Sequence, residues 1–171
     1  MRAKRPNSPA LDSRSFRVAG VVTAIFVAAI TALVPLLASG EQRFEVSFPS
    51  AVHEEALTGR IYVMISRTAE REPRLQIGRT GVPFFGRDVV NLLPGEPGII
   101  DATDLGTPVA SLRDIPAGDY YVQAFVNVYS EFRRADGHVI WMHDDRWEGQ
   151  HWNRSPGNLY SAVERVRLDP E

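Results

Sequence analysis

Cysteine is absent from the 171 residues, and lysine occurs only once, as Lys4. The lack of cysteine excludes disulfide bonds, thiolate zinc sites, a cysteine nucleophile and a lipid-modified N-terminal cysteine. The scarcity of lysine leaves the rest of the chain without a candidate for Schiff-base or serine–lysine chemistry. The sequence also contains no GxSxG nucleophile elbow, no P-loop and no dinucleotide-binding glycine pattern. We therefore predict no catalytic residue, no cofactor and no metal ion.

Positive charge is scarce outside the N-terminus. Residues 1–17 contain five basic residues and one acid, which leaves the remainder of the chain net acidic. Binding to nucleic acid depends on clustered Lys and Arg side chains that displace counterions from phosphate. We therefore expect no nucleic-acid partner.

Residues 18–38 read VAGVVTAIFVAAITALVPLLA and contain no charge. A helix of about 20 such residues can span a bilayer core, and the preceding basic flank would stay in the cytoplasm. We predict a basic flank over 1–17, a transmembrane anchor or signal segment over 18–40, and a domain over 41–171 outside the cytoplasm. The small residues Ala38-Ser39-Gly40 keep a cleaved signal open beside a retained anchor. The expected location is the cell envelope, either at the membrane or, after cleavage, in the periplasm or medium.

From residue 41 the hydrophobic period changes to two, which is typical of half-buried strands. We predict strands over 44–48, 59–66, 74–77, 120–129, 138–142 and 163–168. Residues 78–111 are rich in Gly and Pro and are expected to form loops with short strand fragments. The predicted fold is mainly β, an antiparallel β-sandwich of the immunoglobulin or prealbumin type, preceded by one N-terminal hydrophobic helix.

The two faces of the predicted strand 120–129 differ in polarity. Val122 and Val126 belong to a wholly apolar face, whereas Gln123 belongs to a mixed face that we expect to be only partly covered. Burial of an unpaired carboxylate costs several kcal/mol. We therefore expect Val122→Asp and Val126→Asp to unfold the domain and Gln123→Asp to be tolerated.

Residues 143–153 hold two His, three acids and two Trp. The candidate ligand or partner contacts in and beside this segment are Trp141, His143, Asp145, Trp147, Glu148, His151 and Trp152. The favoured interpretation is a loop that its tryptophans pin to the sheet, so that Trp147→Ala would lower the thermal midpoint. Two alternatives remain open. One is a carbohydrate-binding module with exposed aromatic rings, and the other is a small metal-dependent hydrolase that uses His143, Asp145 and His151.

Several segments together resemble the N-terminal region of a family of bacterial exported proteins predicted to be esterases. The segments are IPAGDYYVQAFVNVY at 115–129, RRADGH at 133–138 and WMHDDRWEGQHWNRSPGNLYS at 141–161, and GRIYVMISR at 59–67 and VPFFGRDV at 82–89 fit the same region. The resemblance covers about residues 44–169. It implies a non-catalytic, β-rich region ahead of an α/β-hydrolase domain.

This chain departs from that family pattern because it stops at Glu171, where the hydrolase domain would follow. No catalytic residue can therefore be transferred to it. We expect an exported, non-catalytic accessory or binding domain, attached to the membrane through its N-terminal segment. An α/β-hydrolase domain or protein is the expected partner.

Overall fold

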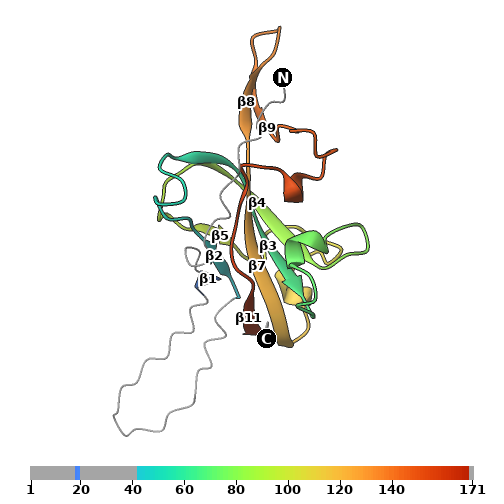
Figure 1. Cartoon of the computed structure of the whole chain (residues 1–171). Helices are drawn as coiled ribbons and strands as arrows, with labels where there is room; N and C mark the ends of the chain where they lie inside the picture. The colour runs from blue at the N-terminus through green and yellow to red at the C-terminus, as the bar shows by residue number, and fades with distance from the viewer. Residues whose placement is uncertain (1–17, 20–41, 170–171) are drawn as a thin grey trace, which may run out of the picture.

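The computed structural model describes residues 18–19 and 42–169 (Figure 1). The fold is mainly β, as predicted, and every strand pair in the described part of the chain is antiparallel. The predicted N-terminal helix lies outside the described residues, apart from Val18–Ala19, which form the short strand β1. Within 18–19 and 42–169, no helix is long and apolar enough to span a membrane.

The larger sheet is built around two long central strands, β3 (Leu57–Ser66) and β7 (Gly118–Val128). Its strand order is β10-β7-β3-β4-β6, and β11 also pairs with β7. The outer strands are β4 (Phe84–Leu92), β6 (Gly106–Thr107), β10 (Leu159–Tyr160) and β11 (Glu164–Leu168). The register sets Ile61 opposite Val126 and Ile65 opposite Val122, so that apolar side chains share one face.

A smaller sheet and a separate hairpin complete the strands. The smaller sheet has the order β1-β2-β5, with β2 at Phe44–Val46 and β5 at Gly98–Ile100. The hairpin consists of β8 (Ser130–Arg133) and β9 (Val139–Met142). Three short 3₁₀ helices, η1 (Pro73–Leu75), η2 (Leu112–Asp114) and η3 (Trp152–Arg154), lie in the connecting segments.

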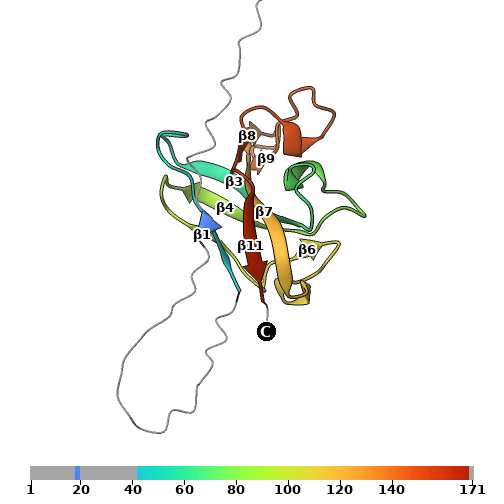
Figure 2. The same ribbon diagram turned by 60° about the horizontal axis from the view of Figure 1, so that its bottom comes forward.

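One hydrophobic core joins the two sheets. Phe44, Val46 and Ile100 of the smaller sheet belong to the same buried cluster as Ile61 and Val122 of the larger one. Figures 1 and 2 show the smaller sheet on one side of the larger sheet, with the segments that carry η1 and η3 on the other. Burial of each large apolar side chain in such a core contributes about 1.5–3 kcal/mol. The predicted apolar face of residues 120–129 is therefore correct.

The opposite face of the larger sheet is covered as well. Trp152 of η3 stacks on Tyr62 of β3, with ring centroids 4.6 Å apart, and its edge meets Phe125 of β7 at 5.5 Å. Gln123, on the same face, is only 1% exposed. The expectation that Gln123→Asp would be tolerated assumed a partly open face, and that assumption is wrong.

Two segments differ from the predicted strands. Residues 74–77 were expected to form a strand, but Pro73 begins the 3₁₀ helix η1, because its fixed φ angle and missing N–H suit the first turn of a helix. Within 78–111, the short strands β5 and β6 are the expected fragments, but the nine-residue strand β4 was not predicted. Gly86 in β4 lies under the Tyr62 ring, where a Cβ atom would come within 2.6 Å of a ring carbon. The glycine thus serves close packing rather than a turn.

Candidate functional site

His143 lies at the start of the tryptophan-rich loop and is held from both sides. Its Nδ1 is 3.0 Å from Oδ1 of Asn127 on β7, and its Nε2 is 2.6 Å from Oε1 of Glu148. Both ring nitrogens therefore face an oxygen, and neither is free to take a proton from a nucleophile. The arrangement ties the loop to the sheet.

Glu148 closes this loop on itself. Its second carboxylate oxygen accepts a hydrogen bond of 2.6 Å from the backbone N–H of Arg146. Desolvation opposes ionisation, but the hydrogen bonds from His143 and the backbone outweigh it and lower the pKa of Glu148 to about 2. The side chain of Glu148 is 9% exposed and that of His143 is 19% exposed. The His143–Glu148 pair thus forms a clasp, mostly shielded from solvent, that connects the loop with β7.

A small cavity borders His143. It has a volume of about 50 Å³ and is lined by Asp144, Arg146, Ser155 and Gly157 among others. Sites for small organic ligands usually enclose about 300–1,000 Å³. The cavity is too small for a sugar ring or an ester substrate beside His143.

Trp147 projects from the tip of the loop. Its side chain is fully exposed, and its backbone lies in the left-handed region at a φ of 73°. The side chain of Asp145 accepts a hydrogen bond of 3.0 Å from the Trp147 N–H, which stabilises the turn. A bulky residue at positive φ is uncommon, and such strain is concentrated at functional positions. The expectation that Trp147 pins the loop to the sheet is wrong.

Trp152 does the packing that was expected of both tryptophans. It is half-buried against Tyr62, Phe84 and Phe125, with centroid distances of 4.6–6.3 Å. Burial raises the pKa of Tyr62 to about 12, so its hydroxyl stays protonated under this cover. Trp152 is therefore a structural anchor, and its ring is not a free binding surface.

The remaining candidates for a metal site do not converge. Asp145 and His151 are both exposed, and Asp145 is bonded to the backbone of its own turn. In the part of the chain that the structure describes, no three His, Asp or Glu side chains are grouped to hold a metal ion. The arrangement of His143, Asp145 and His151 gives no support to the metal-dependent hydrolase.

Trp141 lies on the hairpin β8–β9, which projects from the body (Figure 1). It pairs with Glu131, and Val139 pairs with Arg133, so these four share one face. The other face carries the pairs Phe132–Ile140 and Ser130–Met142. The large apolar residues on both faces are 36–48% exposed, namely Phe132, Val139, Ile140, Trp141 and Met142.

The turn at Ala135-Asp136-Gly137 predicts a hairpin leading into residues 138–142, and the structure has that hairpin as β8–β9. Of its exposed apolar residues, sequence reasoning named only Trp141 as a candidate contact. The run Val139–Met142 is apolar at four consecutive positions, a pattern more typical of a strand buried on both faces, so it does not indicate that both faces are exposed.

No family model matches the chain, and no curated protein or solved structure matches it either. The resemblance to the N-terminal region of exported proteins predicted to be esterases therefore stays a prediction.

Proposed function

We propose that this chain is a non-catalytic accessory domain of the β-sandwich type that binds a partner protein outside the cytoplasm. A sandwich is supported by the single core shared by two antiparallel sheets, an arrangement typical of immunoglobulin-like and prealbumin-like domains. Export is supported by the uncharged run 18–38 behind a basic flank. The partner suggested by the sequence resemblance is an α/β-hydrolase protein.

The exposed hairpin is the observation that carries the binding role. Of ten large apolar side chains exposed in the described residues, six fall within residues 132–147, on the hairpin and the loop tip that follows it. Single exposed apolar residues are ordinary, but a cluster of them marks an interaction surface. A two-stranded ribbon is marginally stable on its own, so contact with a partner would also stabilise the hairpin.

Site-specific photo-crosslinking in the cell envelope tests this role. A photoreactive residue replaces Ile140 on the hairpin or, as the matched control, Leu105, which is 80% exposed and precedes the edge strand β6, separated from β7 by β3 and β4. We expect one protein to crosslink from position 140 only, and the Phe132→Ser, Met142→Ser double variant to abolish that product. Crosslinking from both positions, or from neither, would contradict the proposal. A crosslinked protein that is not a hydrolase would support the binding role of the hairpin but contradict the proposed partner.

Two further measurements address the other parts of the proposal. The purified chain should hydrolyse p-nitrophenyl acetate no faster than a heat-denatured sample, because the sequence has no nucleophile elbow and both ring nitrogens of His143 are engaged. In spheroplasts, added protease should digest residues 41–171. Protection of that part while a periplasmic control protein is digested would refute export.

A carbohydrate-binding module is the second candidate, favoured by the fully exposed Trp147 on its strained backbone. Exposed aromatic rings provide a flat apolar surface for the faces of sugar rings. Retention on cellulose, chitin or xylan that is lost in Trp147→Ala and kept in His151→Ala would support this function over the protein partner. Absence of retention on all three would count against it.

A further inference from the structure

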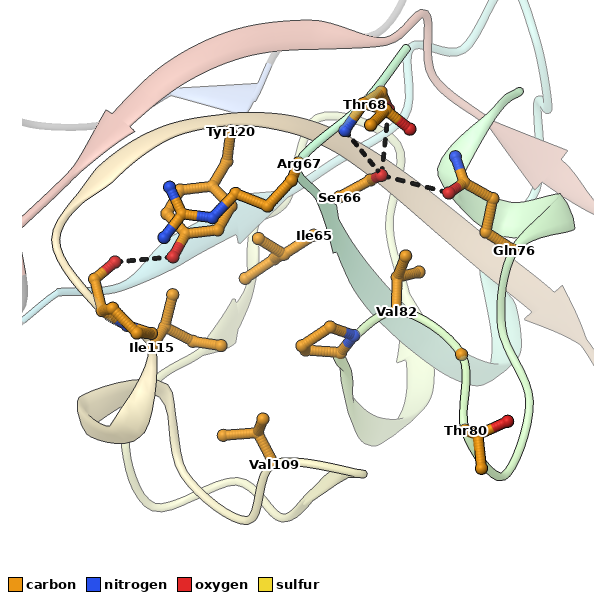
Figure 3. A pocket seen from close by; sticks show the side chains of 13 residues that line it. Ile65, Ser66, Arg67, Thr68, Gln76, Thr80, Val82, Val109, Ile115 and Tyr120 are labelled. Atoms are coloured by element: carbon orange, nitrogen blue, oxygen red, sulfur yellow. Dashed lines mark hydrogen bonds between the residues drawn. The ribbon is translucent and has the colours of Figure 1, made fainter. Parts of the chain in front are cut away.

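A larger cavity lies at the end of β3, apart from the tryptophan-rich loop and the hairpin. Its volume is about 550 Å³, and it opens between residues 65–68, the loop 76–83 and the segment 109–120 (Figure 3). This volume lies within the range of about 300–1,000 Å³ that is usual for small-molecule sites. The apolar lining consists of Ile65, Val82, Pro83, Val109, Ile115 and Pro116.

Two uncharged polar groups of the lining, the hydroxyls of Ser66 and Tyr120, already have partners in the protein. The Ser66 hydroxyl lies 2.9 Å from the Thr68 carbonyl oxygen and 3.2 Å from Oε1 of Gln76. The Tyr120 hydroxyl donates a hydrogen bond of 2.6 Å to the Pro116 carbonyl (Figure 3). These groups are fixed in place, so they shape the cavity but leave little hydrogen-bonding capacity for a ligand.

Arg67 lies at the rim of the cavity and, unlike Ser66 and Tyr120, keeps hydrogen-bonding capacity for a ligand. Its guanidinium stacks on the Tyr120 ring, 3.8 Å from the centroid, and Figure 3 shows it lying over that ring. It also lies against Gly118, where a Cβ atom would come within 2.5 Å of Nη1. Its one hydrogen bond to a described residue is a long one, 3.4 Å to the Asp119 carbonyl, and among described residues it has no carboxylate partner. A guanidinium has five N–H donors in a planar fork that matches a carboxylate.

We propose that this pocket binds an apolar carboxylic acid, with its carboxylate on the Arg67 guanidinium and its hydrocarbon part against Ile65, Val82, Val109 and Ile115. The apolar lining favours a hydrocarbon because transfer of CH₂ groups from water to an apolar surface is favourable. The stacked arginine favours an anion because its fork is already held in place before the ligand arrives. The site is independent of the hairpin, none of whose residues line the cavity.

Calorimetric titration of the purified full chain tests the pocket with three probes, all below micelle-forming concentrations. Decanoate has both the chain and the charge, decanol has the chain alone, and acetate has the charge alone. We expect decanoate to bind at least 10-fold more tightly than either of the others. Equal affinity for decanoate and decanol, or no binding of decanoate, would overturn the proposal.

Three variants locate the binding. Arg67→Gln should lower decanoate affinity at least 10-fold, to the level of decanol, and leave decanol unchanged. Val109→Trp, which fills the cavity from its lining, should abolish binding of both. Arg43→Gln, which removes an equal charge that is paired with Glu45 outside the lining, should change neither. An unchanged affinity in a folded Arg67→Gln variant would contradict the role of Arg67.

Amide chemical shifts provide a readout that does not depend on these variants folding. On addition of decanoate to the unmodified chain, we expect shifts concentrated at Ser66, Gly81 and Val82. Shifts concentrated at Val139–Met142 instead would show that the acid binds the exposed hairpin, and would overturn the pocket assignment without affecting the proposed partner contact.

Discussion

The two faces of the larger sheet are both buried, but by different means. Val122 and Val126 on one face of β7 meet only apolar side chains of the shared core. Gln123 on the other face is equally buried, yet its amide is paired with hydrogen-bonding groups of other segments. The first face is stabilised by exclusion of water, whereas the second depends on the pairing of specific polar atoms. An alternating sequence pattern separates the faces but does not reveal which one is covered.

The pairing on the second face centres on Gln123. Its Nε2 donates to Glu72 at 3.0 Å and to the Ser161 carbonyl at 2.9 Å, and its Oε1 accepts from the Arg74 N–H at 3.1 Å. Burial opposes the ionisation of Glu72, but hydrogen bonds from Arg74 and Gln123 outweigh it and lower its pKa. Arg74 also donates to the Asn153 carbonyl at 2.9 Å, which joins the η1 segment to η3. One glutamine thus holds two covering segments on the sheet.

Val122→Asp should have the largest effect. The carboxylate would replace a fully buried side chain in a core without polar partners. Its cost of several kcal/mol is comparable with a whole domain's stability of about 5–15 kcal/mol, so we expect no soluble folded protein. Val90→Asp, at an exposed site on β4 of the same sheet, is the control and should fold normally. Near-ultraviolet circular dichroism of both proteins decides the outcome, and a native spectrum for Val122→Asp would refute the face assignment.

Gln123→Asp should destabilise the domain by about 3–4 kcal/mol. The shorter side chain loses the hydrogen bonds of the amide and sets a second carboxylate near Glu72, where like charges repel. Urea denaturation measures the loss. Because the repulsion requires both acids, adding Glu72→Gln should restore part of the stability, although Glu72→Gln alone is destabilising. Strictly additive effects of the two substitutions would show that no such repulsion exists.

The two tryptophans of the loop should differ sharply. Trp152→Ala removes the ring that covers Tyr62 and Phe125, and we expect a loss of about 2–3 kcal/mol because the ring is half-buried. Trp147→Ala removes a fully exposed ring and should change stability by less than about 0.5 kcal/mol. Paired urea titrations compare them directly. A larger loss for Trp147→Ala would restore the interpretation in which both rings pin the loop.

Much of the fold follows from local patterns in the sequence. β2 and β7 were predicted within a few residues because apolar side chains recur at every second position, and β3 because its run of apolar residues indicates a central strand. The last strand, β11, was also predicted within a residue. β4 was not predicted because Gly86 interrupts its pattern, and the ring that needs this glycine belongs to Tyr62, more than twenty residues earlier.

The candidate site was less accessible to prediction because its geometry depends on distant segments. Trp147 and Trp152 are chemically identical, and only the position of Tyr62 and Phe125 decides which of them is covered. The clasp of His143 and Glu148 needs Asn127, which the sequence assigned to a mixed face without a partner. The Arg67 pocket combines three separate segments and leaves no local pattern.

Glu148→Gln should destabilise the chain by an amount that depends on pH. The pKa of Glu148 is lowered to about 2 in the folded chain, from an ordinary value of 4.5. The unfolded chain therefore binds this proton at a higher pH than the folded chain does. The stabilisation by Glu148 is fully present above pH 4.5 and is lost as the pH falls from 4.5 towards 2.

The stability difference between the unmodified chain and Glu148→Gln should therefore be constant from pH 6 to pH 5 and shrink towards pH 2. Urea midpoints across this range measure it. Glu55→Gln removes a carboxylate from an exposed position and should give a small difference at every pH. Other carboxylates titrate in the same interval, so the comparison between variants, rather than the acid sensitivity of the chain itself, isolates the clasp. A difference for Glu148→Gln that stayed constant down to pH 2 would mean that the carboxylate does not hold the loop to β7 by its charge.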